Sequence, residues 1–340
     1  MIYVNTRNLA SHLTGVQRYT LEITSEWRRN RKEFIEIKPS FSFGKYSGHL
    51  WEQCALPFKV EKHSILWNPS NTGPIMHDNQ IVTIHDTVPF DHPEWLNKKF
   101  VAWYKFLQPR LAKRVSKIIT ISEFSKERII HYFKVPEHKV HVVYNGVDIK
   151  TPSNIEHSNI ISTMPFDKYI LCVGSVEPRK NVGRLISAWA TLETRYPEFG
   201  LVIVGAKGLE RVFASDNSDK CDSRAQRVYF TGHVSDVDLF HIYKNSVGFC
   251  YPSIYEGFGL PPLEAMCFDK PVLTSNTTAM REICNGSAIL VNPFSVDEIA
   301  EGISDMLTKD NSHMIASGRA LSSSLSWSNC AEKTWGILIE

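Results

Sequence analysis

The stretch Glu256-Gly257-Phe258-Gly259-Leu260-Pro261-Pro262-Leu263-Glu264 places two carboxylates eight positions apart around a glycine-containing loop. The two glycines let the backbone come close to a ligand, and the two prolines suit the first turn of a helix. Backbone N–H groups at the start of such a helix lack partners within it and attract phosphate. The pattern therefore predicts a loop and a helix that bind an anionic ligand. On spacing alone, the two glutamates could equally complement the helix dipole.

A second stretch, Val173-Gly174-Ser175-Val176-Glu177-Pro178-Arg179-Lys180-Asn181, leads from an apolar run into another expected helix. Arg179 and Lys180 follow the Pro178 turn, so two cations and the amides of a helix start can act on one phosphate. An adjacent Arg and Lys are usually solvated surface. The surrounding Gly-x-x-x-Pro-Arg-Lys-Asn pattern favours a phosphate site here.

Short apolar runs alternate with longer amphipathic stretches, which is typical of parallel strands joined by helices. Expected strands lie at 2–5, 64–67, 81–85, 117–121, 140–144, 169–173, 201–204, 228–231, 247–251, 271–275 and 288–291. Expected helices lie at 16–29, 98–115, 122–133, 181–195, 234–245 and 260–267. Ligands of such sheets collect outside the carboxyl ends of the strands, so both quoted stretches should line one crevice.

The chain is long enough for two domains. Residues 1–150 should form the first doubly wound domain, a polar linker should follow at 151–166, and residues 167–325 should form the second. Seven cysteines without a Cys-x-x-Cys pair indicate reduced core thiols and a cytoplasmic protein. The start of the chain lacks a signal-peptide pattern, and no run reaches the roughly 18 apolar residues of a spanning helix.

Basic residues concentrate in the first half. Residues 1–150 hold 22 Lys and Arg against 14 Asp and Glu, a net +8, and the remainder holds 16 against 22, a net −6. The segment 98–119 carries seven of these cations, no acid, and several aromatic residues. It could contact an anionic membrane surface, or it could be an ordinary helix with its aromatics in the core. Nucleic acid is a weaker alternative, because no nucleic-acid-binding module accompanies the patch.

Read together, these stretches resemble the retaining glycosyltransferases of family 4, whose GT-B fold places two Rossmann-like domains across a cleft. The Glu-x7-Glu stretch matches that family's signature, and further matching blocks follow the family's order. They are Thr14-Gly15-Val16-Gln17-Arg18-Tyr19, His85-Asp86, Ile119-Thr120-Ile121-Ser122-Glu123-Phe124-Ser125 and Tyr144-Asn145-Gly146-Val147-Asp148. The resemblance also implies that residues 326–340 form a closing helix that returns to the first domain.

The resemblance assigns roles on the donor side. Arg179 and Lys180, with Gly174, would bind the donor phosphates, although many members carry an Arg where this chain has Ser175. Glu256 would face the donor sugar and act by positioning and electrostatics, and Glu264 would bind the ribose hydroxyls. The other donor-binding positions are the backbone of Val234 at the nucleobase and of Gly257, Phe258, Gly259 and Leu260 at the sugar and distal phosphate.

Two candidate residues lie in the first half. His85 ends an apolar strand and should project into the cleft between the two domains, where it could polarise the donor sugar or accept a hydrogen bond from the acceptor. A lone histidine is more often satisfied locally. Gly15 would approach the donor phosphates from the first domain.

No metal site is expected. Asp236-Val237-Asp238 has the spacing of a metal-binding pair, but these acids stand where the first turn of a helix favours them. A dehydrogenase should carry Gly-x-Gly-x-x-Gly after its first strand, and the glycine loop here lacks the third glycine. A sugar-nucleotide epimerase or a phosphorylase is not expected to carry both stretches. A non-catalytic protein that kept the donor pocket stays open.

The resulting hypothesis is a retaining, metal-independent glycosyltransferase with no cofactor besides its nucleotide-sugar co-substrate. Mannose from GDP-mannose is the leading donor, because the phosphate turn resembles mannosyltransferases of bacterial surface-polysaccharide and O-antigen assembly. A UDP-sugar or GDP-fucose is the alternative donor. The acceptor would be a glycan linked to undecaprenyl lipid, and peripheral contact with the inner face of the plasma membrane would run through residues 98–119.

Overall fold

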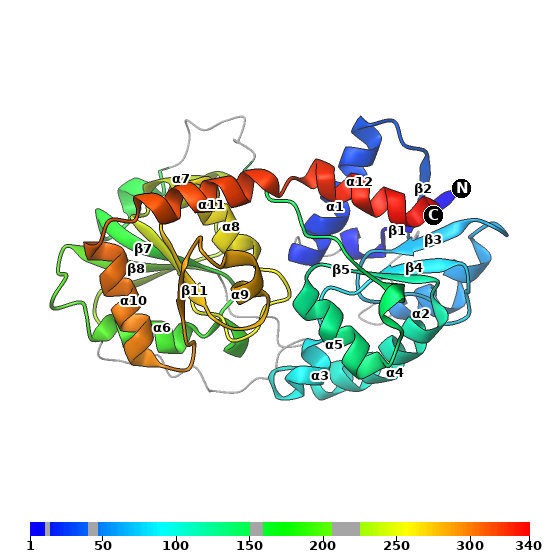
Figure 1. The fold of residues 1–340 in the computed structure, drawn as a ribbon, viewed down its shortest axis with the longest axis horizontal. Helices are drawn as coiled ribbons and strands as arrows, with labels where there is room; N and C mark the ends of the chain where they lie inside the picture. Colours follow the sequence, from blue (N-terminus) through cyan, green and yellow to red (C-terminus); the bar gives the residue numbers. More distant parts are fainter. Residues whose placement is uncertain (11–13, 40–46, 150–158, 206–224) are drawn as a thin grey trace. The chain divides into compact units, whose positions relative to one another are not determined.

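The computed structural model describes residues 1–10, 14–39, 47–149, 159–205 and 225–340 (Figure 1). These residues form two compact units. The first comprises Met1–Pro93, Lys98–Gly146 and Leu325–Glu340, and the second comprises Glu94–Asn97 and Val147–Ser324. Residues 151–158 of the expected linker lie outside the described part of the chain. Its described end carries a short 3-10 helix, η6 (Ile161–Thr163).

The first unit is built on a parallel sheet of six strands in the order β2-β1-β3-β4-β5-β6. The strands are β1 (Ile2–Asn5), β2 (Phe34–Ile37), β3 (Ile65–Asn68), β4 (Gln80–Thr83), β5 (Lys117–Thr120) and β6 (Val140–Val142). The five strands predicted for this half are confirmed within a few residues. Sequence patterning missed β2, because it lies at the edge of the sheet and its middle residues Ile35 and Glu36 are exposed.

Helices cover this sheet. They are α1 (Gly15–Arg29), α2 (Ser47–Cys54), α3 (Val88–Asp91), α4 (Lys98–Arg114), α5 (Glu123–Phe133) and, from the end of the chain, α12 (Trp327–Ile339). Ser326 caps α12 by accepting a hydrogen bond from the Asn329 backbone N–H at 3.2 Å. The helix packs on α1, where the buried Trp27 donates its indole N–H to the Ala331 carbonyl at 2.9 Å. The last helix is therefore part of the first unit's core.

The second unit is also a parallel sheet of six strands, in the order β12-β11-β10-β7-β8-β9. Its strands are β7 (Lys168–Val173), β8 (Phe199–Val204), β9 (Val228–Gly232), β10 (Gly248–Tyr251), β11 (Val272–Ser275) and β12 (Ile289–Val291). Its helices are α6 (Val182–Ala190), α7 (Asp236–Asn245), α8 (Leu260–Cys267), α9 (Thr278–Cys284), α10 (Val296–Thr308) and α11 (Ser312–Ser324). The predicted pair of doubly wound α/β domains is confirmed.

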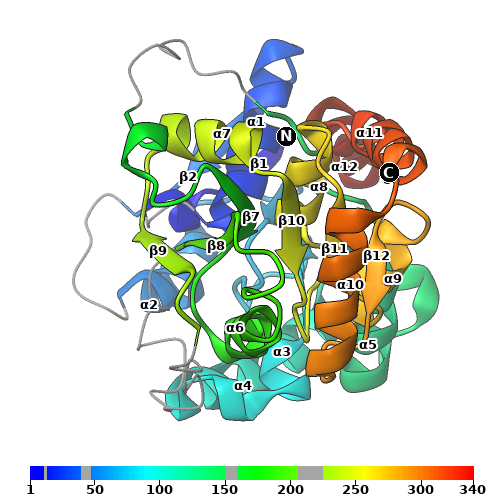
Figure 2. The ribbon, with the colours of Figure 1, turned by 90° about the vertical axis from the view of Figure 1, so that its left-hand side faces the viewer.

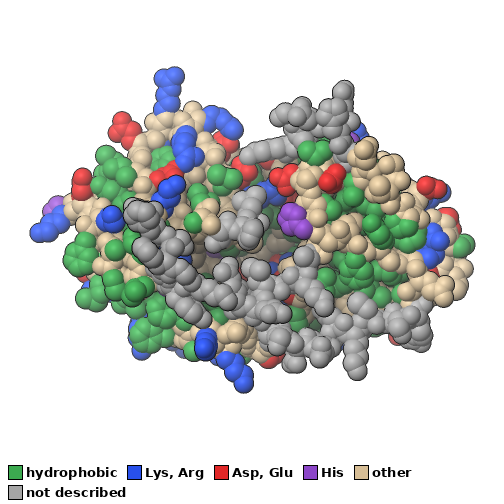
Figure 3. Space-filling view, turned by 180° about the vertical axis from the view of Figure 1, so that it is seen from behind, with side chains coloured by type: hydrophobic (Ala, Val, Ile, Leu, Met, Phe, Trp, Pro, Cys, Tyr) green, Lys and Arg blue, Asp and Glu red, His purple; other side chains and the backbone are tan. Residues whose placement is uncertain are grey.

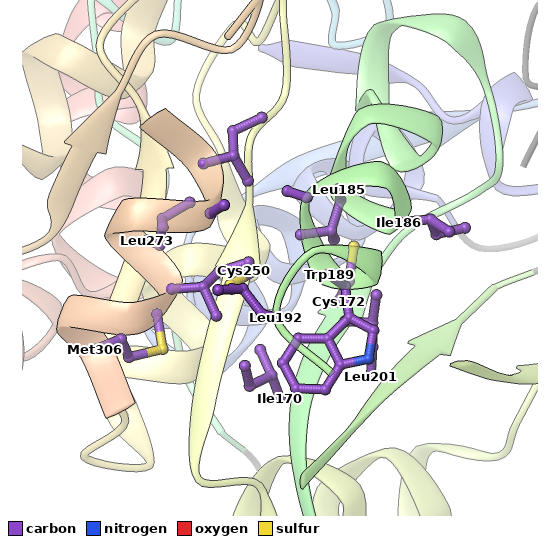
Figure 4. Close-up of a cluster of buried hydrophobic side chains, with 14 of the residues drawn as sticks. Ile170, Cys172, Leu185, Ile186, Trp189, Leu192, Leu201, Cys250, Leu273 and Met306 are labelled. Carbon is purple, nitrogen blue, oxygen red and sulfur yellow. The ribbon is translucent and has the colours of Figure 1, made fainter. Parts of the chain in front are cut away.

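Helices lie on both faces of the second sheet. Figure 2 shows α6 and α10 on one side of the strands and α7 and α8 on the other. The main core fills the layer between the sheet and α6 with α10, where Trp189 and Met306 meet β-strand residues such as Ile170 and Leu201 (Figure 4). Apolar residues on both faces of the strands explain why they read as continuous hydrophobic runs.

The strand order reverses between β7 and β10. Starting from β7, the chain first builds outward through β8 and β9, and then returns to add β10, β11 and β12 on the other side. At such a point the two crossover helices lie on opposite faces, which leaves the carboxyl ends of the two central strands open to a ligand. The loops after β7 and β10 therefore occupy the position that favours a binding site.

No helix within the described residues is long and apolar enough to cross a membrane. The six described cysteines are free thiols, and Cys172, Cys250, Cys284 and Cys330 are buried. Cys54 is exposed, so it is not the core thiol that we expected, and Cys221 lies outside the described residues.

Gly146 tests the attachment of α12 to the first unit. A Cβ atom there would lie 2.2 Å from the Trp327 backbone nitrogen, and backbone cannot move aside cheaply. We expect Gly146→Ala to lower the free energy of unfolding by about 1–3 kcal/mol, as overpacking does. The matched change Gly336→Ala, inside α12 with open space around it, should raise that free energy by about 0.5–1 kcal/mol. Urea unfolding measures both, and equal stabilities would contradict this packing.

Candidate functional site

Two loops meet at the carboxyl ends of β7 and β10. The Arg179 carbonyl oxygen accepts hydrogen bonds from the Ser253 hydroxyl and the Ile254 backbone N–H, both at 2.8 Å. Because β7 and β10 are adjacent parallel strands, the chain that leaves each strand reaches the same edge of the sheet. The structure thus brings together the two stretches that the sequence singled out, although they are separated by about eighty residues.

Glu256 is the centre of this contact. Its carboxylate accepts hydrogen bonds from Lys180 Nζ at 2.7 Å, Arg179 Nη1 at 3.1 Å, and the hydroxyls of Tyr251 and Ser253 at 2.8 Å each. All of these side chains come from the two loops or from the end of β10. Tyr251 and Ser253 were not among the predicted site residues, and only their places at and just after a strand end could have suggested them.

Glu256 is buried yet ionised. Burial alone would raise its pKa, but Lys180 and Arg179 outweigh that effect and hold the pKa of Glu256 at about 2. Burial and the nearby Arg179 lower the pKa of Lys180, against the opposing effect of Glu256. Burial and the Glu256 charge raise the pKa of Tyr251 well above its usual value, so its hydroxyl stays protonated and donates. The carboxylate is therefore a fixed negative charge that is saturated by donors.

A second carboxylate balances the site. Glu177 is buried, and its Oε1 lies 2.7 Å from Arg179 Nε, so the guanidinium is held between Glu177 and Glu256. The sequence led us to expect an excess of positive charge at this point. Instead, Arg179 and Lys180 face two buried carboxylates. Sequence reasoning assigned no role to Glu177, because nothing in a loop glutamate indicates that it folds inward.

Backbone conformation shapes the loops at this edge of the sheet. Gly174, directly after β7, has φ of +152°, and Gly205, directly after the neighbouring β8, has φ of +143°. A Cβ atom on Gly205 would lie 2.1 Å from the Gly174 carbonyl oxygen, so these backbones approach as closely as only glycine allows. Gly259, with φ of +97°, caps the start of α8, whereas Gly257 is buried without a positive φ.

The two helix starts differ in the amides that they offer. Pro261 and Pro262 occupy the second and third positions of α8 and have no N–H, so Leu260 supplies the one amide of that first turn. Asn181, in the left-handed conformation, is the N-cap residue of α6. Its side-chain amide donates to the carbonyls of Pro252 at 2.9 Å and Pro293 at 2.6 Å, which fixes the start of the helix. The first amides of α6 have no partner within the helix, so α6 offers more anion-binding amides than α8.

Glu264 lies on α8, and its Oε2 accepts a hydrogen bond from the Tyr243 hydroxyl of α7 at 3.0 Å. Val234 stands half-buried just before α7 and next to Gly232, whose φ is +70°. Phe258 is buried between the two glycines of the loop. Glu264 is thus oriented by α7, the helix that follows the Val234 backbone.

Asp236 and Asp238 begin α7. The Ser235 hydroxyl caps the helix by accepting from the Asp238 backbone N–H at 3.1 Å. Asp236 and Asp238 thus lie in the first turn of a helix, the interpretation that we preferred to a metal-binding pair. Across the described residues, no group of three or more His, Cys, Asp or Glu side chains could hold a metal ion.

His85 and Gly15 belong to the first unit, so they are not among the residues that the second unit brings together. His85 follows β4 and is buried, and its Nε2 lies 2.8 Å from the Pro69 carbonyl oxygen. A carbonyl can only accept, so Nε2 carries the proton and Nδ1 carries a lone pair. Burial lowers the pKa of His85 to about 4. Gly15 is the first residue of α1, and a Cβ atom there would meet nothing within 4 Å.

The chain matches two protein-family models. Residues 155–320 match the glycosyl transferases group 1, and residues 67–151 match glycosyltransferase family 4. The O-antigen chain mannosyltransferase B of Escherichia coli is 31% identical over 281 residues, which cover 80% of this chain and 73% of that protein. The O-antigen chain mannosyltransferase RfbU of Salmonella typhimurium is 29% identical, with 72% of this chain and 65% of that protein covered. The chain thus spans about two thirds to three quarters of these two relatives.

Solved structures share the fold. The Anabaena protein HepE, in complex with UDP and glucose, has a TM-score of 0.74 at 16% identity and covers 100% of this chain and 99% of its own. WaaG, a glycosyltransferase involved in lipopolysaccharide biosynthesis, has a TM-score of 0.69 at 17% identity, with 99% of each chain covered. These likenesses confirm the predicted architecture.

The buried imidazole of His85 predicts a pH dependence of stability. Its pKa is about 4 in the folded protein and about 6.5 unfolded, so the unfolded chain binds more protons between these values. The contribution of the neutral His85 side chain to the free energy of unfolding is therefore fully present above pH 6.5. It is lost as the pH falls toward 4, by up to about 3 kcal/mol. We expect His85→Gln to lose less unfolding free energy than the wild type between pH 7.5 and pH 4.5. Equal losses in urea titrations would place the imidazole in solvent.

Proposed function

The chain belongs to glycosyltransferase family 4, and from this membership we propose that it transfers a hexose from a nucleotide sugar to a glycan with retention and without a metal ion. The observation that carries the proposal is the meeting of Arg179, Lys180 and Glu256 at the carboxyl ends of β7 and β10. A doubly wound sheet binds its ligand at that point, and these side chains have the chemistry of a phosphate site.

The proposed reaction places its charges as follows. The bond between the anomeric carbon and the phosphate oxygen breaks, and its electron pair stays on the departing phosphate. Arg179, Lys180 and the first amides of α6 stabilise that negative charge. The acceptor hydroxyl oxygen bonds to the anomeric carbon from the same face, and its proton passes to the departing phosphate. The configuration is then retained without an enzyme-bound intermediate.

Glu256 suits a positioning role better than a nucleophilic one. Four donors already contact its carboxylate, and its pKa of about 2 makes it a weak base. A nucleophile of the kind that retaining glycosidases use would need a free oxygen aimed at the sugar. In the proposed reaction Glu256 holds Arg179 and Lys180 in place, and its negative charge stabilises the positive charge that develops on the anomeric carbon.

The rest of the donor would extend from this point toward α7 and α8. Glu264, oriented by Tyr243, accepts hydrogen bonds from the ribose hydroxyls, and the backbone at Val234 contacts the nucleobase. The backbone from Gly257 to Leu260 contacts the sugar and the distal phosphate. In the first unit, His85 accepts a hydrogen bond from the acceptor through Nδ1, since its neutral state and occupied Nε2 leave that role open.

We propose mannose as the sugar and GDP-mannose as its donor, because the relatives with about 30% identity are named mannosyltransferases of O-antigen chains. The acceptor would accordingly be a surface polysaccharide in assembly, carried on undecaprenyl lipid. A UDP-sugar or GDP-fucose donor, and a sugar-nucleotide-binding protein without activity, are the alternatives that the experiment below separates.

The test is calorimetric binding of GDP, UDP and ADP, each with and without EDTA. We expect selective binding of GDP that survives EDTA. Lys180→Ala should weaken GDP binding and lower turnover with GDP-mannose on the order of a hundredfold, because phosphate charge stabilisation is lost. Glu256→Gln removes one of the two carboxylates that balance the cations, so it should bind GDP more tightly and yet turn over more slowly.

Lys244→Ala, at an exposed position on α7, is the matched control and should behave as the wild type. Glu264→Gln should weaken GDP binding through the lost ribose contacts. Selective binding of UDP would keep the transferase and replace the donor. A wild-type protein that binds none of the three nucleotides would refute the proposed donor site.

The lipid-linked acceptor motivates a second proposal, in which α4 lies against an anionic membrane surface. On the side that Figure 3 shows, Lys and Arg side chains stand out from the first unit beside apolar surface. Along α4, six cations are exposed without an acid in the helix: Lys98, Lys99, Lys105, Arg110, Lys113 and Arg114, the last of which pairs with Asp78 outside the helix. Phe106 is 48% exposed beside the Arg110 guanidinium, whereas Phe100, Trp103 and Tyr104 are half-buried. The helix therefore presents cations and one aromatic ring to solvent.

Vesicle binding tests this second proposal. The wild type should sediment with vesicles that contain phosphatidylglycerol and should be released by 0.5 M salt, on the scale of ~1 kcal/mol per cation near the surface. Reversing Lys105 and Lys113 to Glu should weaken the binding at least tenfold. Reversing Lys244 and Lys309 in the second unit makes the same change in net charge and should have little effect. Equal losses in both double variants would contradict a role for α4.

A further inference from the structure

The loop that carries Glu256 is held on its other side by the chain that leaves β11. Strand β11 lies next to β10 in the sheet, so both chains leave the sheet at the same edge. Residues 274–278 read Thr-Ser-Asn-Thr-Thr, and all four hydroxyls contact the backbone of residues 251–256. The donors are Thr274 to the Tyr251 carbonyl at 2.9 Å, Ser275 to the Ser253 carbonyl, and Thr277 to the Ile254 carbonyl at 3.4 Å.

The fourth hydroxyl, that of Thr278, differs from the other three. It accepts a hydrogen bond from the Glu256 backbone N–H at 3.3 Å, so its partner is the central residue of the candidate site. Thr278 also has φ of +54°, directly after the extended cap residue Thr277 with φ of −120°. This conformation is an outlier for a β-branched residue, whereas a glycine would adopt it freely but would bring no hydroxyl. Such an outlier at a candidate site points to a role for its side chain.

Helix α9, which begins at Thr278, approaches the same loop at a second point. The buried Met280 packs against Gly259, where a Cβ atom would lie 2.0 Å from Met280 Cε. The loop from Glu256 to the start of α8 therefore meets α9 at both of its ends. On the opposite side, Lys180 contacts the Glu256 carboxylate. The Glu256 side chain is thus held from the β7 loop, and its backbone is held from the β11 loop.

We propose that Thr278 is a positioning residue: its hydroxyl sets the place of the Glu256 backbone, from which the carboxylate reaches Lys180 and Arg179. The strained backbone of Thr278 directs that hydroxyl toward the Glu256 N–H. In this role Thr278 acts through Glu256 and contacts no substrate. The inference rests on the proposed function for the reaction that Glu256 serves. Because Glu256 stabilises charge that develops in the transition state, displacing it should slow turnover more than it weakens donor binding.

The experiment measures the release of GDP from GDP-mannose, with water in place of the acceptor, for three substitutions. Thr278→Val keeps the branched shape and removes the acceptor oxygen. It should lower kcat about fivefold, the loss of one uncharged hydrogen bond, and leave KM within about twofold of the wild type. Thr278→Ser keeps the hydroxyl and should retain most of the wild-type kcat.

Thr278→Gly removes the hydroxyl together with the strain. It should turn over as slowly as the valine variant without a fall in melting temperature, because relief of the left-handed strain offsets the extra chain entropy of glycine. Thr308→Val, at an exposed threonine of α10 whose hydroxyl contacts the Ser304 carbonyl, is the matched control and should behave as the wild type. A glycine variant whose melting temperature and turnover fall together would show a merely structural role and would overturn the inference.

Hydrogen exchange of the Glu256 backbone amide, followed by NMR, tests the contact without any turnover. Exchange should be about fivefold faster in Thr278→Val than in the wild type and unchanged in Thr278→Ser. A wild type that neither binds GDP nor releases it from GDP-mannose would refute the proposed function, and the exchange rates would still decide whether Thr278 positions Glu256. Equal exchange in the wild type and the valine variant would overturn the inference, and so would a serine variant as slow as the valine variant.

Discussion

The contact between Glu256 and Lys180 holds the candidate site together. It joins the loop after β7 to the loop after β10, and both side chains are about nine-tenths buried. Removing either partner would leave an uncompensated buried charge, which costs far more than an exposed ion pair contributes. The Arg179 carbonyl is fixed by Ser253 and Ile254 on the same pair of loops, so the backbone and the side chains enforce one arrangement. The described contacts therefore connect the two loops without a ligand.

The same contacts limit how strongly the proposed donor site can attract an anion. Arg179 and Lys180 are balanced by Glu177 and Glu256, so a diphosphate does not enter a field of uncompensated positive charge. In the proposed donor site, its stabilisation would come from the first amides of α6, which lack partners within the helix, and from hydrogen bonds that the cations share between carboxylate and phosphate. Such a site favours a ligand whose oxygens lie where the donors are and whose charge is negative. Discrimination among nucleotide sugars requires that dependence on geometry.

The sequence predicted the architecture and the convergence of Arg179, Lys180 and Glu256 because both follow from strand periodicity. Parallel strands end at one edge of the sheet, so residues placed just after strands meet there. The partners of these side chains were not predictable in the same way. Glu177 and Tyr251 reach Glu256 or Arg179 through side-chain packing that periodicity does not encode. The edge strand β2 lacks the apolar run of a central strand, and the pair of Arg7 and Glu52 spans 45 residues with no motif at either end.

The two units have a similar ion pair at the point where their strand order reverses. In each, an arginine from the loop that follows the first strand is held by a buried carboxylate from another element, Arg7 by Glu52 and Arg179 by Glu256. The surroundings differ. Asn5 and Thr72 add uncharged groups around Glu52, whereas Lys180 adds a second cation beside Glu256 and brings the helix amides of α6 with it. The position at β7 and β10 therefore has two cations beside its carboxylate, where the position at β1 and β3 has one arginine.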